Sequence, residues 1–465
     1  MRLTPALALS SRVAIACLLF LTANAAPGLL SPHRTQAMQA WRPTSPDPRF
    51  GVVEAYQAPV QASEIGVGWE RYTFWWKKIQ PNGPNSYDLW ATDRDHQINS
   101  EIAAGRQVVG LLENTPDWAA QFPKEHGSSI PKGLYLPYTD PHNYWAHFVK
   151  LIVKHYKGRI DDWILWNEVN IPSGQWNTWR GSTADYAQLV KVAYLAAKAV
   201  NPGARIVLYG DPYWYDHGAF FAQLMQDLSR EPQAAANHDY FDAANLHLYS
   251  RPSDYQMVIA LYRKLMARYG IHKPLWISET NALPYNDPIR PYARSGYFGT
   301  LQDQASYLIE AFSLALALNV SRIEVNRMVD GSDFKAGGEP FGLLRNNHTA
   351  RPEFYAFQAV TALFNGVTGG KIRFNKRTGV YVVTLYKPGT LLTVTWNQNP
   401  KARRVSIPAV TQQAVAFDKF GNGDAVTAKG GRYRFTLTPS TDNTDPANPK
   451  DYVIGGSPVV LMQSN

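Results

Sequence analysis

Two glutamates, Glu168 and Glu279, are the residues of this chain best suited to chemistry. Each one ends a short apolar run that contains a tryptophan and is typical of a buried strand. A single glutamate in such a place is as often a structural ion-pair partner at the rim of a barrel. Two of them, carried to one rim, are what cleavage of a glycosidic bond requires: one protonates the leaving oxygen, and the other attacks or stabilises the anomeric carbon. The pair therefore predicts a glycosidase.

The segments around these glutamates alternate between strand-like and helix-like patterns. Helices are expected at 144–156, 184–200, 255–269 and 352–364, where polar caps or proline precede the apolar periodicity. Strands are expected at 50–55, 68–73, 107–112, 162–167, 205–210, 243–249, 275–279 and 322–326. Eight strands interleaved with helices predict a (β/α)8 barrel, with Glu168 and Glu279 after the fourth and seventh strands. An open doubly wound sheet is the alternative, but no glycine-rich phosphate loop follows the first strand.

After Gly369 the sequence pattern changes to short runs in which apolar and polar residues alternate, separated by turn residues such as Gly421-Asn422-Gly423. The runs lie at 380–386, 391–396, 403–407, 414–417, 433–437 and 459–462, and 439–449 is expected to be a polar surface loop. This pattern predicts a C-terminal β-sandwich over residues 369–465 that either binds sugar or braces the barrel, bracing being the simpler interpretation. The barrel would then cover residues 49–368.

The N-terminus has the pattern of a cleavable export signal over residues 1–26, followed by a linker or arm over 27–48. Basic residues flank the start, the apolar run 13–21 is too short to span a bilayer, and Ala23-Asn24-Ala25 offers a cleavage site. We therefore expect a secreted, periplasmic or cell-surface protein with no transmembrane segment. Cys17, the only cysteine, lies within the signal, so cleavage near Ala25 leaves no thiol for catalysis or metal binding; lipidation of Cys17 is the alternative.

The composition suits a globular protein of 465 residues with one large and one smaller domain. Its 14 tryptophans and 26 tyrosines include enough aromatic rings for sugar stacking as well as core packing. The formal net charge is +9, and removal of Arg2 and Arg12 with the export signal leaves 44 basic and 37 acidic residues, a net charge of +7. This charge favours contact with anionic surfaces or an acidic polysaccharide. Because the basic residues are scattered along the chain, nucleic-acid binding is not predicted. Separately, we expect the protein to be a monomer.

The string Trp166-Asn167-Glu168-Val169-Asn170 resembles the Asn-Glu signature of the clan A glycoside hydrolases. The resemblance covers about residues 50–365 and is strongest to family 39-type enzymes and related bacterial endoglycosidases, in which proline usually stands at the position of Val169. It implies that Glu168 is the acid/base and Glu279 the nucleophile of a retaining mechanism, with their carboxyl groups about 5 to 5.5 Å apart. It implies no cofactor and a carbohydrate substrate.

The same resemblance implies supporting roles for four residues. Arg71 would bind the nucleophile and keep it ionised, and Asn167 would bond the sugar 2-hydroxyl. His247 would lie near the acid/base and Tyr249 would point at the nucleophile. No set of residues is spaced for a metal. Further rim or cleft residues are predicted to bind substrate: Trp118, Trp176, Trp179, Tyr213, Trp214, Trp276 and Asn326.

Other functions remain compatible with parts of this pattern. A transglycosylase would use the same residues, and a non-catalytic glycan-binding protein could keep the barrel, although neither glutamate nor Asn167 is lost. Serine-based acyl transfer is excluded because no G-x-S-x-G elbow is present. The eighth strand offers no tryptophan for the floor of the sugar site, so the sugar, its linkage and endo or exo action stay open.

Overall fold

The computed structural model describes residues 45–89, 94–125, 127–172, 178–290, 298–331, 339–445 and 447–464. Eight parallel strands form a closed barrel in the order β1-β2-β3-β4-β5-β6-β7-β10. They are β1 (Phe50–Val52), β2 (Trp69–Trp75), β3 (Gln107–Glu113), β4 (Asp162–Leu165), β5 (Arg205–Asp211), β6 (Ala243–His247), β7 (Leu275–Thr280) and β10 (Arg322–Val325). The predicted (β/α)8 barrel is confirmed, strand by strand. The predicted export signal and Trp176 lie outside the described residues.

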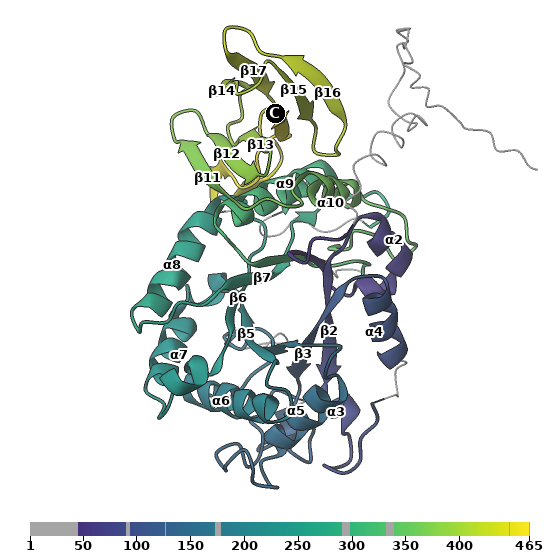
Figure 1. Cartoon of the computed structure of the whole chain (residues 1–465), viewed down its shortest axis with the longest axis vertical. Helices are drawn as coiled ribbons and strands as arrows, with labels where there is room; N and C mark the ends of the chain where they lie inside the picture. The colour runs from purple at the N-terminus through teal and green to yellow at the C-terminus, as the bar shows by residue number, and fades with distance from the viewer. Residues whose placement is uncertain are drawn as a thin grey trace, which may run out of the picture.

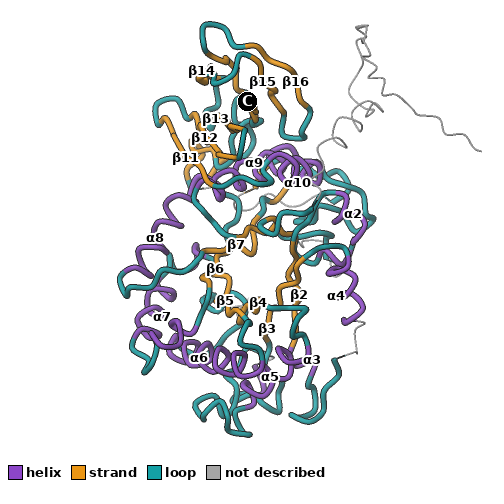
Figure 2. The backbone as a smooth tube through the Cα atoms, in the orientation of Figure 1, coloured by secondary structure: helices purple, strands orange, loops and turns teal. Residues whose placement is uncertain are grey.

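Helices surround the strands on the outside of the barrel (Figure 2). They are α2 (Pro59–Glu64), α3 (Trp76–Ile79), α4 (Arg94–Ala103), α5 (Tyr144–His155), α6 (Thr183–Val200), α7 (Ala219–Ser229), α8 (Tyr255–Ala267), α9 (Leu301–Ala317) and α10 (Pro352–Leu363). Capping boxes explain two of the starts: Ser182 with Asp185 begins α6, and Thr300 with Asp303 begins α9. In the described part of the chain, none of these helices has both the length and the apolar character needed to cross a membrane.

The loops contain smaller elements. Short 3-10 helices are η1 (Ala55–Gln57), η2 (Pro123–Glu125), η3 (Tyr213–Tyr215), η4 (Ala235–Tyr240) and η5 (Pro252–Asp254). A two-stranded parallel pair, β8 (Leu283–Pro284) and β9 (Phe298–Gly299), follows β7. Because β8 directly follows the strand that carries Glu279, this pair helps to frame the same rim.

The N-terminal half of the barrel is closed by a plug of Trp69, Trp276 and Arg322. The Arg322 guanidinium lies 5.4 Å from the ring centre of Trp69 and 4.6 Å from that of Trp276, and its Nη2 lies 3.2 Å from a carboxylate oxygen of Asp162. Cation–π contacts are strong when they are desolvated, as they are here. The plug leaves the opposite rim, where the strands end, as the open end of the barrel.

The C-terminal region is a small β-sandwich, as predicted. Its main sheet has the order β11-β12-β13-β20-β15-β16, and the ribbon β14–β17 packs on one face of it. The strands are β11 (Gly369–Asn375), β12 (Val380–Lys387), β13 (Thr390–Asn397), β14 (Arg403–Pro408), β15 (Gln413–Phe417), β16 (Gly423–Thr427), β17 (Arg432–Leu437), β18 (Thr444–Asp445), β19 (Asn448–Tyr452) and β20 (Val459–Ser464). The edge strands β11 and β16 were not predicted, because they are largely exposed and so lack a clear apolar alternation. The expected polar loop at 439–449 contains β18 and only the start of β19, the strand with which β18 pairs.

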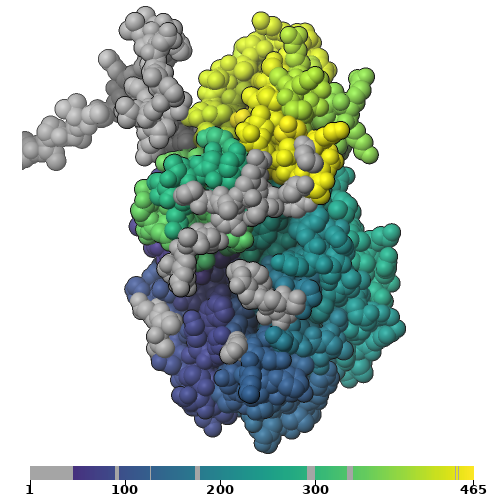
Figure 3. All heavy atoms as spheres, turned by 180° about the vertical axis from the view of Figure 1, so that it is seen from behind, coloured from purple at the N-terminus to yellow at the C-terminus, as the bar shows by residue number. Residues whose placement is uncertain are grey.

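Helix α9 of the barrel packs against strands β11, β12 and β13 of the sandwich (Figure 1). The space-filling view shows the two parts in broad contact (Figure 3). The Lys419 ammonium donates to the Ser306 hydroxyl of α9 at 3.1 Å, and the Gly455 amide donates to Glu310 Oε1 at 2.9 Å. Arg251, after β6, forms an ion pair with Asp445 at 2.6 Å. The sandwich therefore braces the barrel through buried polar contacts as well as through apolar packing.

Candidate active site

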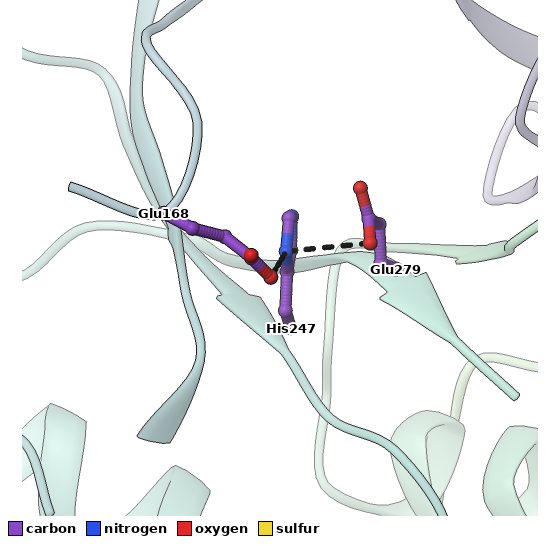
Figure 4. A group of neighbouring side chains, drawn as sticks. All are labelled: Glu168, His247 and Glu279. Atoms are coloured by element: carbon purple, nitrogen blue, oxygen red, sulfur yellow. Dashed lines mark hydrogen bonds and ion pairs between the residues drawn. The ribbon is translucent and has the colours of Figure 1, made fainter. Parts of the chain in front are cut away.

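Glu168 and Glu279 meet at the open rim, with His247 between them (Figure 4). The Nδ1 atom of His247 lies 2.7 Å from Glu168 Oε1 and 3.5 Å from Glu279 Oε2. One oxygen of each carboxyl group and a ring nitrogen of His247 all lie within 4.8 Å of one another. At least one oxygen of each carboxyl group is therefore close enough to the other for both groups to act on a single glycosidic bond.

A sharp turn after β4 positions Glu168. Trp166 and Glu168 both have left-handed backbone conformations, with φ of 68° and 45°, which non-glycine residues adopt only when their surroundings hold them there. The buried Trp166 indole donates to the Thr178 carbonyl at 2.7 Å, and the Thr178 hydroxyl donates to the Asn167 carbonyl. Asn167 also forms a β-bridge with Gly210 of β5. Thr178 thus clamps the turn that presents the acid, a role for which the sequence carries no signal.

Glu279 is held as an anion by two donors on opposite oxygens. Arg71 of β2 donates to Oε1, and the Tyr249 hydroxyl donates to Oε2. The Asn326 amide donates in turn to the Tyr249 hydroxyl at 2.8 Å, which orients it. Burial alone would raise the pKa of Glu279, but His247, Arg71 and Tyr249 outweigh burial and lower the pKa to about 2. An ionised, oriented carboxylate suits nucleophilic attack.

His247 is positioned by a chain of polar side chains beneath it. The Asn245 amide donates to the Ser278 hydroxyl at 2.7 Å, and that hydroxyl lies 3.2 Å from His247 Nε2. Arg71 Nη1, a donor only, also lies 3.5 Å from Nε2, so Nε2 is placed to accept, while Nδ1 faces Glu168 Oε1. We therefore assign the ring proton to Nδ1, which donates to Glu168 Oε1. Ser278 and Asn245 were not predicted, although Ser278 directly precedes Glu279.

Two further carboxyl groups lie near the pair and were also missed. Glu113 ends β3, and burial, together with the charges of Glu279 and Glu168, raises its pKa to about 7 against the opposing effect of Arg71. Glu324 of β10 is fully buried, and burial raises its pKa well above the ordinary value. The signal for both was the one used for Glu168 and Glu279, an acidic residue in an apolar strand.

The predicted aromatic residues have different environments. Trp118 is half-buried, its indole donates to the Gln80 carbonyl at 2.6 Å, and Trp214 is half-buried with the Arg251 guanidinium 5.9 Å from its ring centre. Trp179 and Tyr213 are buried, so little of either ring is accessible. Trp276 belongs to the plug in the N-terminal half of the barrel, which does not support its predicted contact with substrate. Trp276 lies at the start of β7 and Glu279 near its end, so the strand holds this tryptophan at the end of the barrel opposite the two glutamates.

The donor set favours proton chemistry over metal binding. Glu168, His247 and Glu279 form the one group of three His, Cys, Asp or Glu ligand atoms close enough to hold an ion among the described residues. However, the Arg71 guanidinium already neutralises Glu279, and a second cation beside it would be repelled. The three side chains are better suited to hold and transfer a proton.

The chain is therefore a (β/α)8-barrel protein with a C-terminal β-sandwich and two glutamates at the rim of the barrel. Several solved structures share its fold. One is a family 39 glycoside hydrolase from the gut symbiont Bacteroides cellulosilyticus WH2, with a TM-score of 0.66 at 15% identity over 90% of this chain and 81% of that one. Another is a GH30 endoxylanase from Clostridium papyrosolvens C71, with a TM-score of 0.60 at 14% identity over 91% of this chain and 98% of that one. A monomeric β-xylosidase from Caulobacter crescentus CB15 has a TM-score of 0.57 at 14% identity, with 90% and 97% coverage.

No protein-family model and no curated protein matches the sequence. The predicted likeness to family 39 enzymes is confirmed for the fold. At these identities the likeness carries no statement about activity, which must be argued from the site.

Proposed function

We propose that this protein is a retaining β-glycosidase that hydrolyses an oligo- or polysaccharide, with Glu168 as acid/base and Glu279 as nucleophile. The observation that carries the proposal is the close pair of carboxyl groups in which only Glu279 is ion-paired with a guanidinium. The shared fold with glycoside hydrolase structures supports it.

In the first step, Glu279 attacks the anomeric carbon and forms an ester bond to the sugar as the glycosidic C–O bond breaks. Glu168 gives its proton to the departing oxygen, so the leaving group departs as an alcohol. His247 donates to Glu168 Oε1, which leaves the proton on Oε2 free to face the substrate. Arg71 and Tyr249 hold Glu279 in the orientation that attack requires.

In the second step, Glu168 is ionised and takes a proton from water while that water attacks the anomeric carbon. The ester bond to Glu279 breaks, and the product keeps the configuration of the substrate. Asn167 precedes the acid in the rim turn and is the proposed partner of the sugar 2-hydroxyl, a contact that strengthens in the transition state.

The test uses Glu168→Gln, Glu279→Gln and, as a matched control, Glu64→Gln, which removes an exposed carboxylate on α2. The substrates are dinitrophenyl and unsubstituted phenyl β-glycosides of xylose, glucose, mannose and galactose, with product anomers followed by NMR. Glu279→Gln should lose activity on every substrate. Glu168→Gln should still release dinitrophenolate, which leaves without an acid, but not phenolate.

The β anomer should appear first with the wild-type protein and the control. An α product would mean inversion and would reject Glu279 as nucleophile. Sugar oligomers longer than the substrate would mean that transfer to an acceptor competes with hydrolysis, the transglycosylase alternative.

We also propose that the protein acts outside the cytoplasm, because residues 1–26 have the pattern of an export signal. N-terminal sequencing of the protein expressed with this segment would find a start near Ala26 if the signal is cleaved. An intact Met1 in the culture medium or periplasm would contradict cleavage.

A further inference from the structure

The positive charge of this chain is concentrated in the sandwich. Residues 369–465 contain 13 lysines and arginines against five aspartates and no glutamate, whereas residues 45–368 contain 29 basic and 32 acidic residues. The barrel region is therefore slightly acidic, and the sandwich carries most of the net charge of +9. A separate electrostatic character points to a separate partner.

The ribbon β14–β17 shows where part of this charge is displayed. Its inward residues pack on the main sheet; they are Val405, Ile407, Tyr433 and Phe435. The outward residues alternate with them and form what we call the arginine face: Arg404, Ser406, Arg432, Arg434 and Thr436. All three arginines are exposed, and the ribbon lies on the part of the sandwich away from the barrel (Figure 1).

The arginine face has no acidic counterpart. Among the residues that the structure describes, no carboxylate lies within ion-pair distance of Arg404, Arg432 or Arg434. Arg432 donates to the Ser406 hydroxyl at 2.6 Å, which steadies the guanidinium on the surface without neutralising it. Alternate residues of a strand are about 6.6 Å apart and neighbouring strands about 4.8 Å apart, so an extended polyanion can meet several of these groups together.

We propose that the arginine face binds an acidic polysaccharide whose sugars carry carboxylates. Guanidinium groups pair with carboxylates through two parallel hydrogen bonds, and the hydroxyls of Ser406 and Thr436 suit sugar hydroxyls. The face has no aromatic ring on which a nucleic-acid base could stack. The benefit of such binding rests on the proposed glycosidase function, since a chain held on the sandwich raises the local concentration of polymer at the barrel.

The experiment measures binding of polygalacturonate to the full chain by isothermal titration calorimetry, in the Glu279→Gln background so that the polymer stays intact. Fully methyl-esterified polygalacturonan, which has the same backbone without the charge, is the matched probe. The test variant is Arg404→Gln/Arg432→Gln/Arg434→Gln. Its control removes three exposed charges from the barrel, one in α5, one in α8 and one at the C-cap of α8: Lys154→Gln/Lys264→Gln/Arg268→Gln.

We expect polygalacturonate binding to weaken at least tenfold in the test variant, to persist in the control, and to fall as salt rises from 50 to 300 mM. The variant Arg404→Lys/Arg432→Lys/Arg434→Lys keeps the positive charge but loses the paired donors of each guanidinium, so its affinity should lie between those of the wild type and the glutamine variant. It replaces the glutamine variant if that variant folds poorly. Activity of the same triple variants with active Glu279 on an aryl glycoside should stay unchanged, which separates this proposal from the proposed function. Equal binding of the esterified polymer, equal loss in the control, or stronger arginine-dependent binding of duplex DNA would overturn it.

Discussion

Gly210 of β5 makes the space that His247 of β6 occupies. A Cβ atom at position 210 would lie 1.8 Å from His247 Nε2, far inside contact distance. The imidazole can therefore reach Glu168 only because this barrel position has no side chain. Gly210→Ala should push the ring off Glu168 and lower kcat/KM by about 10 to 100-fold, the usual range for disturbing a group that orients a general acid.

A double-mutant cycle checks that the effect runs through His247. In a His247→Ala background, Gly210→Ala should cost little further activity, because the clashing ring is gone. A full additional loss there would mean that Gly210 acts through another contact, such as its β-bridge with Asn167.

Replacing Arg71 should change the pH profile as well as the rate. With Arg71 present, the pKa of Glu279 is lowered to about 2, so the nucleophile is ionised throughout the working range. In Arg71→Met, loss of the guanidinium leaves burial to raise that pKa, and activity should now fall as pH decreases through a higher value. We expect the acid limb of kcat/KM to move up by about one unit or more, together with a loss of about 100-fold or more.

Arg71→Lys is the control, because it keeps the positive charge while losing the second guanidinium nitrogen. Its acid limb should move less than that of Arg71→Met. An unchanged acid limb in both variants would show that Arg71 only shapes the barrel wall.

Stability should depend on pH through Glu310 at the junction of α9 with the sandwich. Burial, followed by the charge of Asp303, raises the pKa of Glu310 well above the ordinary value, despite the Gly455 amide and Lys419. The folded state therefore holds this proton after the unfolded state has released it. Binding of this proton in the folded state stabilises the protein fully below the ordinary glutamate pKa of about 4.5. As pH rises toward the pKa of Glu310 in the folded protein, this stabilisation is lost at up to about 1.4 kcal/mol per pH unit.

Glu310→Gln removes this titration while keeping an acceptor for the Gly455 amide. Its free energy of unfolding, measured by urea titration at pH 5 and pH 8, should increase relative to that of the wild type as pH rises. The exposed Glu64→Gln should show no such trend. A difference between Glu310→Gln and wild type that does not change with pH would mean that Glu310 does not titrate between these values.

Chelation should leave activity intact. Glu168, His247 and Glu279 are close enough to hold an ion, but Arg71 already supplies the cation beside Glu279. Dialysis against EDTA should therefore leave kcat/KM within about twofold, since proton transfer by Glu168 needs no metal. A large loss restored by added Zn²⁺ would contradict the roles assigned to these three side chains.

Local pattern was sufficient for the elements of the barrel and for its two main carboxylates. The periodicity of apolar residues and the caps of the helices are properties of neighbouring residues, so the eight strands and the place of Glu168 and Glu279 at their ends were readable directly. The edge strands β11 and β16 were not readable, because exposed strands bury too few side chains to show an alternation.

Only the tertiary structure decided which side chains meet. Arg71 and Glu279 are 208 positions apart, and their contact depends on the closure of the barrel. The order of Asn245, Ser278 and His247 depends on the register between β6 and β7, and the space for the imidazole depends on a glycine in β5. Strand direction placed Trp276 in the plug, and pairing of β14 with β17 gathered arginines that are scattered along the chain onto one face. The sequence by itself determined the elements, since they follow from local physics, whereas register and closure decided the contacts, because these join residues that no local pattern connects.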